Sequence, residues 1–301
     1  QAWEDWWKVS RDGVVPKHIY FMGKDNIPFH TIIWPSIIMG MNSASTGKPP
    51  NSTPSPGELA LESNVPANEY LMLQGGQFSK SRKHGVWLPS FLERYDPDTL
   101  RYYLSINMPE GHDSDFRWDE YVDRVNNELI GTYANFVHRV LTLAHRLPNE
   151  TTNPLGQYYN QELHLDHISK VDELLQSATD SLEKQRFKEA LRSIMSIAQL
   201  GNSILQESAP WNHIKSPDSS EAQESLSALA YSWLLCKGLA VTLRPFIPKQ
   251  SERLWDMLGC TEDIDTVLWL DSFNSTTFSW NNSKPEPLFE RLDLDSILEH
   301  E

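Results

Sequence analysis

The chain has 301 residues, 39% of them apolar and 22% charged, and a net charge of −15. This length and balance are typical of a soluble protein with one large or two to three ordinary domains. The sequence contains no run of 18 apolar residues, so a membrane span is not expected. The acidic balance excludes a protein that grips nucleic acid over its whole surface, so any contact with RNA must be local.

The cysteine content and the N-terminus bear on the compartment. Cys236 and Cys260 form no Cys-x-x-Cys pair, which excludes a cysteine-based zinc site within this chain and favours a reducing compartment such as the cytoplasm. The first residues, Gln1 onward, show no signal-peptide pattern. They begin abruptly in amphipathic sequence, as a cut fragment or a processed chain would.

The first 40 residues predict one β-α unit. Residues 17–22 have the character of a strand, and a turn at 23–26 leads into an apolar helix over 27–39. Pro28 suits the first turn of this helix, whereas Pro35 should kink it or end its first part.

A loop and a second strand follow. Residues 42–56 are rich in Asn, Ser, Thr, Gly and Pro, which predicts a surface loop. Residues 69–73 predict a buried strand. Two strands joined through a helix are consistent with a parallel α/β sheet, although two strands make only half of a doubly wound domain.

The remaining chain has helical periodicity. Residues 88–94 predict a short helix, and Asp96-Pro97-Asp98 is an acidic start for another over 99–106. Long helices with short connections then predict a bundle, at 119–146, 160–183, 186–208, 219–244 and 249–258. A packed tail with a short helix at 293–300 ends the chain, so the fold class is α/β followed by mostly α.

The turn after the first strand lies where open α/β sheets bind ligands. Gly23 can let a nucleotide approach the backbone, and the Asp25 carboxylate can accept hydrogen bonds from ribose hydroxyls. An ordinary turn with Asp25 or Asn26 as helix cap fits equally well. His30, one helical turn further on, either lines a small-molecule pocket or is a structural histidine.

After the second strand, Gly75-Gly76 opens a loop that contains Ser79, Lys80, Ser81 and Arg82. A mobile loop with ammonium and hydroxyl donors suits negative charge that develops on a phosphate. A solvated surface turn is the alternative.

Two features of the bundle suit unstacked RNA bases. Asn135 and Arg139 are four residues apart and share a helical face, and both side chains can read base edges. Pro210 ends a helix just before Trp211, whose indole can stack on a base. The alternatives are a solvated polar face and a core tryptophan.

Together these segments resemble the methionyl-tRNA synthetases, a family of class I aminoacyl-tRNA synthetases, over roughly residues 3–295. The sequence of residues 23–30 is closer to the archaeal and eukaryotic branch of the family than to common bacterial forms. The segments that carry the resemblance are 21–30, 65–71, 78–82, 98–104, 135–139 and 209–211.

The resemblance implies three regions. Residues 1–87 would be the second half of a Rossmann-type catalytic domain, 88–117 a connecting stem-contact region, and 118–301 an α-helical anticodon-binding domain. It also implies that methionine is activated by ATP, with Mg²⁺, to methionyl-adenylate, and that the methionyl group then passes to tRNA(Met).

The resemblance also assigns roles to residues. Lys80 would stabilise the ATP phosphates, with Ser79 and Ser81 shaping or assisting the loop. Gly23 and Asp25 would contact the adenosine and ribose, and Asn26 and His30 would border the methionine pocket. The residues that would read the CAU anticodon are Asn135, Arg139, Pro210 and Trp211.

Several departures limit these roles. Gln77 and Phe78 replace the usual Lys and Met, so one charge near the phosphates is missing. Lys83-His84 replaces a small, Gly-containing run, and Gly131 stands where a second anticodon-reading Asn can occur.

The chain also contains no His-x-Gly-His motif, which belongs to the first half of the family's catalytic domain. We therefore expect a C-terminal portion that is inactive without an N-terminal half and has no membrane partner. A non-catalytic tRNA-binding module is the main alternative. Another class I synthetase, such as a leucyl or cysteinyl enzyme, is a third.

Overall fold

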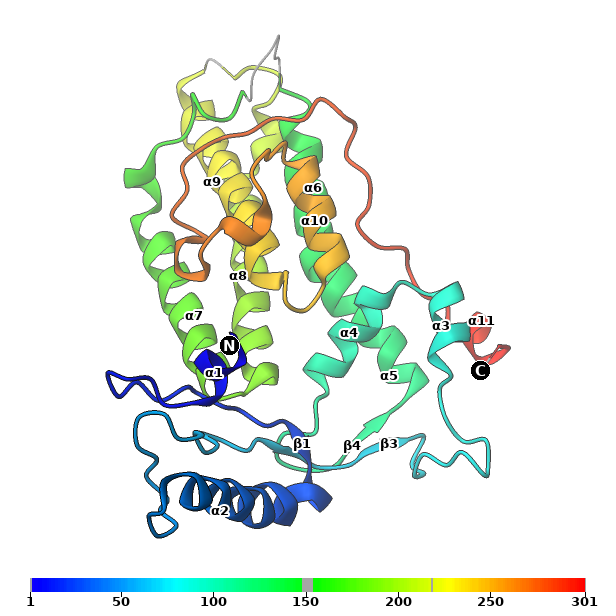
Figure 1. The fold of residues 1–301 in the computed structure, drawn as a ribbon. Helices are drawn as coiled ribbons and strands as arrows, with labels where there is room; N and C mark the ends of the chain where they lie inside the picture. Colours follow the sequence, from blue (N-terminus) through cyan, green and yellow to red (C-terminus); the bar gives the residue numbers. More distant parts are fainter. Residues whose placement is uncertain (1, 148–153, 218, 301) are drawn as a thin grey trace. The chain divides into compact units, whose positions relative to one another are not determined.

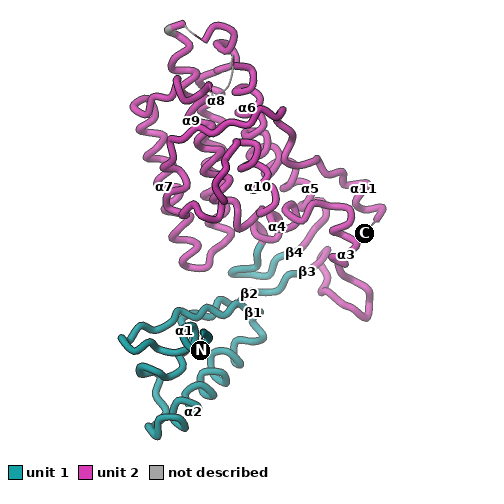
Figure 2. Tube along the Cα trace, turned by 45° about the horizontal axis from the view of Figure 1, so that its top comes forward, with its two compact units in different colours: residues 1–72, 108–115 teal, residues 73–107, 116–301 magenta. Residues whose placement is uncertain are grey.

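The structure is a computed structural model that describes residues 2–147, 154–217 and 219–300. The chain divides into two compact units, coloured separately in Figure 2. Unit 1 comprises Gln1–Met72 and Met108–Asp115, and unit 2 comprises Leu73–Asn107 and Phe116–Glu301.

Unit 1 contains a short parallel ladder. In this ladder β1 (Met22–Gly23) pairs with β2 (Ala67–Asn68), Met22 opposite Ala67. A separate parallel bridge joins Ile19 to Asn64. The parallel pairing expected from the sequence is therefore present, but the regular part of the first strand is shorter than 17–22. Its partner lies just before the expected strand at 69–73.

The second expected strand is present over β3 (Leu71–Leu73), although only Leu73 of its residues is buried, and it pairs with β4 (Ser114–Phe116) rather than with β1. The prediction did not include β4, because a three-residue strand has too little periodicity to stand out. The chain passes from one unit to the other within each of these strands, and also between Asn107 and Met108.

The helix predicted over 27–39 is longer than expected. A π-helical stretch, Phe29–Ile33, runs into α2 (Trp34–Thr46), and Pro35 falls in the first turn of α2, where a missing N–H costs little. Thus Pro35 marks the change from π to α geometry and does not end the helix. The N-terminal α1 (Ala2–Trp7) belongs to the same unit.

The predicted loop at 42–56 was wrong over its first residues, because α2 continues to Thr46 and ends at Gly47 with a left-handed φ of 70°. The buried Asn42 explains this extension. Its amide nitrogen donates to the Leu59 carbonyl at 3.0 Å, and its oxygen accepts from the Leu59 N–H at 2.9 Å. These two bonds tie the last turns of the helix to a distant segment and offset the weak helix propensity of Asn, Ser and Thr.

Unit 2 is a helical bundle with a short preceding segment (Figure 1). The predicted helices are confirmed within a few residues. They are α3 (Leu88–Arg94), α4 (Pro97–Ile106), α5 (Trp118–Asp123), α6 (Asn135–Ala144), α7 (Leu165–Glu183), α8 (Phe187–Ser208), α9 (Ser220–Leu243), α10 (Pro248–Met257) and α11 (Leu294–Leu298).

Two details of these helices matter later. The side chain of Asp96 caps α4 by accepting the Asp98 N–H at 2.9 Å, as the acidic start predicted. The helix expected over 119–146 is interrupted, because a π-helical stretch, Arg124–Ala134, separates α5 from α6. Such stretches are frequent at functional sites, and Asn135 follows this one directly.

The core of unit 2 lies between the long helices. α8 packs on α7 and α9, and α9 packs on α10. Gly201 of α8 allows the ring of Phe136 to approach, since a Cβ there would lie 2.3 Å from the ring. Residues Glu221–Leu243 of α9 are long and apolar enough to cross a bilayer, but the 18-residue apolar stretch within this segment is wholly buried in the protein.

Candidate active site and RNA-binding surface

The end of β1 and the turn after it hold three of the predicted site residues. Gly23 is exposed, and a Cβ added there would meet nothing within 4 Å, so the fold itself does not require glycine at this position. Asp25 is exposed, and each of its carboxylate oxygens accepts from the Tyr70 hydroxyl at 2.7 Å. The Asn26 carbonyl accepts a hydrogen bond from Nδ1 of His30 at 3.1 Å, which fixes the orientation of that imidazole.

A cavity of about 580 Å³ lies beside this turn, and its volume is in the range of small-molecule sites. His30 lines it, whereas Asn26 is not among the described residues that do. The lining residues are otherwise aromatic or aliphatic: Trp7, Ile19, Tyr20, Phe21, Phe29, Ile33, Trp34 and Ile37.

This lining suits a short, flexible, apolar group. Aromatic edges favour a thioether sulfur, and the Tyr20 hydroxyl accepts from the Trp34 indole N–H at 3.3 Å. Sequence reasoning did not single out these aromatic residues. The spacing of Phe29, Ile33 and Ile37 at four-residue intervals is a signal that could have indicated one apolar face.

The lysine loop in unit 2 consists of two successive turns. Gln74 and Gly75 have φ of 50° and 75°, and they close a tight turn in which Leu73 and Gly76 exchange backbone hydrogen bonds at 2.8 and 2.9 Å. Ser79 and His84 exchange backbone bonds at 2.8 and 2.9 Å. Residues 80–83 therefore form the tip of a second hairpin.

His84 ties the second hairpin to the first. Its Nε2 lies 2.8 Å from the Leu73 carbonyl oxygen, so this nitrogen must carry a proton and donate it. Gly76 makes the contact possible, because a Cβ there would lie 3.0 Å from the imidazole Nε2. The departure from the family pattern at His84 thus gives the loop an anchor.

The predicted catalytic side chains lie on this hairpin. Lys80 is exposed at the tip, together with Arg82 and Lys83. Oγ of Ser79 lies 3.2 Å from Oγ of Ser81 and accepts the Arg82 N–H at 3.3 Å. The serines therefore shape the turn, and the three cations form an exposed group that suits an anionic ligand.

The bundle brings two of its predicted RNA-binding residues together. The Arg139 guanidinium carbon lies 5.5 Å from the Trp211 ring centroid. Asn135 is exposed one helical turn before Arg139, and Trp211 is 38% exposed. Pro210 is buried at the corner that follows α8, so it shapes the corner and does not offer a surface.

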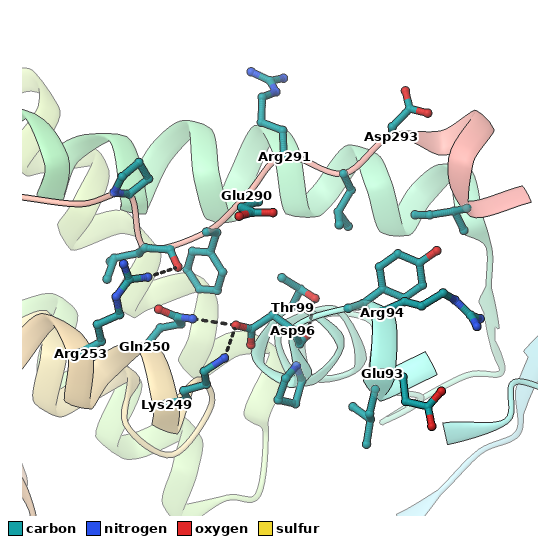
Figure 3. A pocket seen from close by; sticks show the side chains of 18 of the residues that line it. Glu93, Arg94, Asp96, Thr99, Lys249, Gln250, Arg253, Glu290, Arg291 and Asp293 are labelled. Atoms are coloured by element: carbon teal, nitrogen blue, oxygen red, sulfur yellow. Dashed lines mark hydrogen bonds and ion pairs between the residues drawn. The ribbon is translucent and has the colours of Figure 1, made fainter. Parts of the chain in front are cut away.

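A second cavity in unit 2, of about 950 Å³, lies among α3, α4, α10 and the C-terminal tail (Figure 3). Asp96 accepts from Nζ of Lys249 at 2.9 Å and from Nε2 of Gln250 at 2.7 Å. The buried Asp98 accepts the Gln250 N–H at 2.8 Å. These bonds join the start of α4 to the start of α10. The sequence did not predict these hydrogen bonds, because their partners are distant in the chain.

Among residues 2–147, 154–217 and 219–300, no group of three or more His, Cys, Asp or Glu side chains is arranged to hold a metal ion.

Comparison with known families covers almost the whole chain. A family model described as tRNA synthetases class I (M) matches residues 1–141, and one described as the anticodon binding domain of methionyl tRNA ligase matches residues 154–297. The chain belongs to the methionyl-tRNA synthetase family.

The curated relatives carry the name methionine–tRNA ligase. The protein of Dehalococcoides mccartyi is 39% identical over 299 residues, which are 99% of this chain and 49% of that protein. The protein of Roseiflexus castenholzii is 33% identical over 323 residues, and that of Pyrococcus abyssi is 33% identical over 296 residues. They cover 99% and 98% of this chain, and 51% and 38% of the relatives. The chain thus spans about half the length of the relatives it matches, or less.

A solved structure of Mycobacterium tuberculosis methionyl-tRNA synthetase bound by methionyl-adenylate has the same fold. The TM-score is 0.70 at 21% identity, over 93% of this chain and 51% of that one. The predicted fold class is confirmed: a Rossmann-like half is followed by a helical anticodon-binding domain.

Proposed function

We propose that this chain is the C-terminal portion of a methionine–tRNA ligase. The observation that carries the proposal is the 39% identity that extends over 99% of the chain to a protein of that name. In the proposed reaction, a methionine carboxylate oxygen attacks the ATP α-phosphorus and pyrophosphate leaves. A hydroxyl of the terminal adenosine of tRNA(Met) then attacks the methionyl carbonyl, and AMP leaves.

In unit 1, the cavity lined by His30 would take the methionine side chain, with Asn26 at its border. The aromatic lining supports this assignment, since it offers apolar surface and sulfur–aromatic contacts. Gly23 and Asp25 would contact the adenosine and ribose of ATP, which enters as its Mg²⁺ complex.

In unit 2, the exposed Lys80 would neutralise the charge that develops on the ATP phosphates. Ser79 and Ser81 would hold the tip of the hairpin in shape. Arg82 and Lys83 add positive charge at the same tip, which offsets the charge that is missing at Gln77.

The surface formed by Asn135, Arg139 and Trp211, with the buried Pro210 shaping the corner that holds Trp211, would bind the CAU anticodon of tRNA(Met). An exposed indole beside a guanidinium and an amide offers both stacking and base-edge hydrogen bonds. On this proposal residues 1–87 act in catalysis, 88–117 connect, and 118–301 bind the anticodon.

We also assign the N-terminal half of the ligase as the partner of unit 1. Several apolar side chains of the helical run 29–46 are about half exposed, which is unusual for a surface that contacts only solvent. They are Phe29, Ile32, Ile33, Ile37 and Met41. Both cysteines of the chain are buried free thiols, which fits the cytoplasm as the compartment.

Methionine-dependent ATP–pyrophosphate exchange tests the proposal. The chain alone should show no substantial exchange, and the ligase restored with the N-terminal half should exchange and charge tRNA. Lys80→Ala should abolish the restored activity, whereas the exposed Lys184→Ala should not. Normal exchange by the isolated chain would contradict the need for a second half.

The same experiment distinguishes the alternatives. Gln77, which lowers the charge of the loop, is the observation that favours a non-catalytic tRNA-binding module. That alternative predicts tRNA binding without charging after the N-terminal half is added. A leucyl or cysteinyl enzyme predicts charging that does not depend on the CAU anticodon.

A further inference from the structure

The Tyr70 side chain makes a polar contact with the turn after β1. It lies between β2 and β3, and its hydroxyl is 2.7 Å from both carboxylate oxygens of Asp25. A single O–H that is shared equally between two oxygens fixes the plane of the carboxylate. Asp25 itself is exposed, so its carboxylate remains accessible to a ligand.

The tyrosine is itself held by its backbone. Its N–H donates to Oδ1 of Asp113 at 2.9 Å, and its carbonyl accepts the Ser114 N–H at 2.9 Å. Asp113 directly precedes β4 and Ser114 is its first residue, and both belong to unit 1 together with Tyr70. These two backbone hydrogen bonds therefore fix the position of the Tyr70 Cα.

The ring of Tyr70 is held by Lys24, which stands directly between Gly23 and Asp25 in sequence. Its ammonium lies 4.1 Å from the ring centroid and 3.0 Å from Oδ1 of Asp113, and it also pairs with Glu69. A cation against an aromatic face limits the rotation of the ring. The hydroxyl is thus directed at Asp25 by contacts on both the backbone and the ring.

The bond leaves Asp25 able to bind a ligand. An ionised carboxylate has about four lone-pair directions, and one shared donor uses only part of them. The Asp25 carboxylate also raises the pKa of the Tyr70 hydroxyl, so Tyr70 stays a donor at physiological pH. The carboxylate is therefore oriented but not saturated.

We propose that Tyr70 is a positioning residue that holds the Asp25 carboxylate ready for the vicinal hydroxyls of the ATP ribose. This inference rests on the proposed role of Asp25 in binding ATP. Without the hydroxyl, the side chain of Asp25 would rotate freely and would have to be ordered when ATP binds, which weakens binding. Tyr70 does not contact the reacting atoms in this proposal, so its effect falls on ATP affinity.

The test uses the complete ligase that contains this chain and measures ATP–pyrophosphate exchange. Tyr70→Phe removes only the hydroxyl and should raise the KM for ATP about 10-fold, with the KM for methionine and kcat little changed. Tyr95→Phe removes the hydroxyl of a tyrosine outside this network and should leave all three values unchanged. The melting temperature of Tyr70→Phe should match that of Tyr95→Phe.

A double-mutant cycle shows whether Tyr70 acts through Asp25. Asp25→Asn should itself raise the KM for ATP, and adding Tyr70→Phe to Asp25→Asn should then cost far less than 10-fold. Asp113→Asn, which removes a charge beside Lys24, should raise the KM for ATP in the same direction as Tyr70→Phe.

The outcomes separate the two proposals. An unchanged KM for ATP in Asp25→Asn would overturn the role of Asp25 and with it the proposed ribose contact. A raised value in Asp25→Asn with no effect of Tyr70→Phe would overturn the positioning role alone. Equal costs of Tyr70→Phe in both backgrounds would also overturn it, because Tyr70 would then act independently of Asp25.

Discussion

The guanidinium of Arg139, on α6, lies over the ring of Trp211, at the corner after α8, with 5.5 Å between the guanidinium carbon and the ring centroid. A planar cation on an aromatic face restrains both side chains. The 38% of Trp211 that remains exposed is then presented in a fixed orientation. If the proposed function holds, the bundle offers an organised stacking surface before RNA binds, and this would lower the ordering cost of binding.

Trp211→Ala should weaken binding of tRNA(Met) by about 1–3 kcal/mol, the usual value of one base–aromatic stack. Methionine activation in the restored ligase should be unchanged. Titration of fluorescent tRNA measures the first quantity and pyrophosphate exchange the second. Trp6→Ala is a matched control, because that indole is 74% exposed in unit 1. Loss of folded structure in Trp211→Ala would instead make the residue a structural one.

Gly76→Ala should loosen the lysine hairpin. The new Cβ would lie 3.0 Å from Nε2 of His84 and would push the imidazole away from the Leu73 carbonyl. We expect faster tryptic cleavage after Lys80, Arg82 and Lys83. Gly85→Ala is the control, since its Cβ would meet Phe78 at an ordinary 3.6 Å. Equal cleavage rates in the two variants would show that His84 does not anchor the hairpin.

Met41→Glu should weaken the association of the chain with its N-terminal half. Met41 is 54% exposed on α2 and does not line the 580 Å³ cavity, so a charge there tests the surface alone. Ser52→Glu places the same charge on the exposed loop that follows α2 and should have little effect. Co-purification and restored exchange measure the association. Similar association of both variants would place the partner on another face.

The stability of unit 2 should fall at acidic pH because of His164. Burial lowers the pKa of His164 below its ordinary value of 6.5, and the nearby His167 lowers it further. The unfolded chain then binds the proton more readily than the folded one. This histidine therefore supports stability above about pH 6.5, and the contribution is lost as the pH falls toward the folded pKa.

Denaturant unfolding followed by tryptophan fluorescence at pH 7.5, 6.5 and 5.5 checks this expectation. His164→Gln can keep a partner for Ser227, whose Oγ lies 2.9 Å from Nε2 of His164, and it should flatten the pH dependence. The exposed His112→Gln should keep the wild-type slope. A wild-type slope in His164→Gln would assign the acid sensitivity to other groups.

Local signals explain why the bundle could be predicted. The helix starting at Asp96 is capped by its own sequence neighbours, and α3, α8 and α10 begin and end within a residue or two of their expected limits. Capping, proline placement and apolar periodicity act within one or two turns of the helix. They are therefore visible in the sequence without any knowledge of the partners.

Contacts between distant residues explain the differences. α2 runs past its expected end because Asn42 bonds to Leu59, and the first strand pairs with residues 67–68 because register depends on the neighbouring strand. The spacing of Phe29, Ile33 and Ile37 reveals an apolar face, but only folding closes the cavity around His30.

The sequence by itself determined the family resemblance, the helical order of the bundle and the residue types that suit phosphate, methionine and RNA. These features depend on local periodicity and on short motifs, which can be recognised without knowledge of the tertiary contacts. Only the tertiary structure decided that Tyr70 reaches Asp25, that His84 anchors the lysine hairpin and that Arg139 lies over Trp211. Each of these contacts joins residues from different turns, strands or helices, so its geometry arises only when the elements pack.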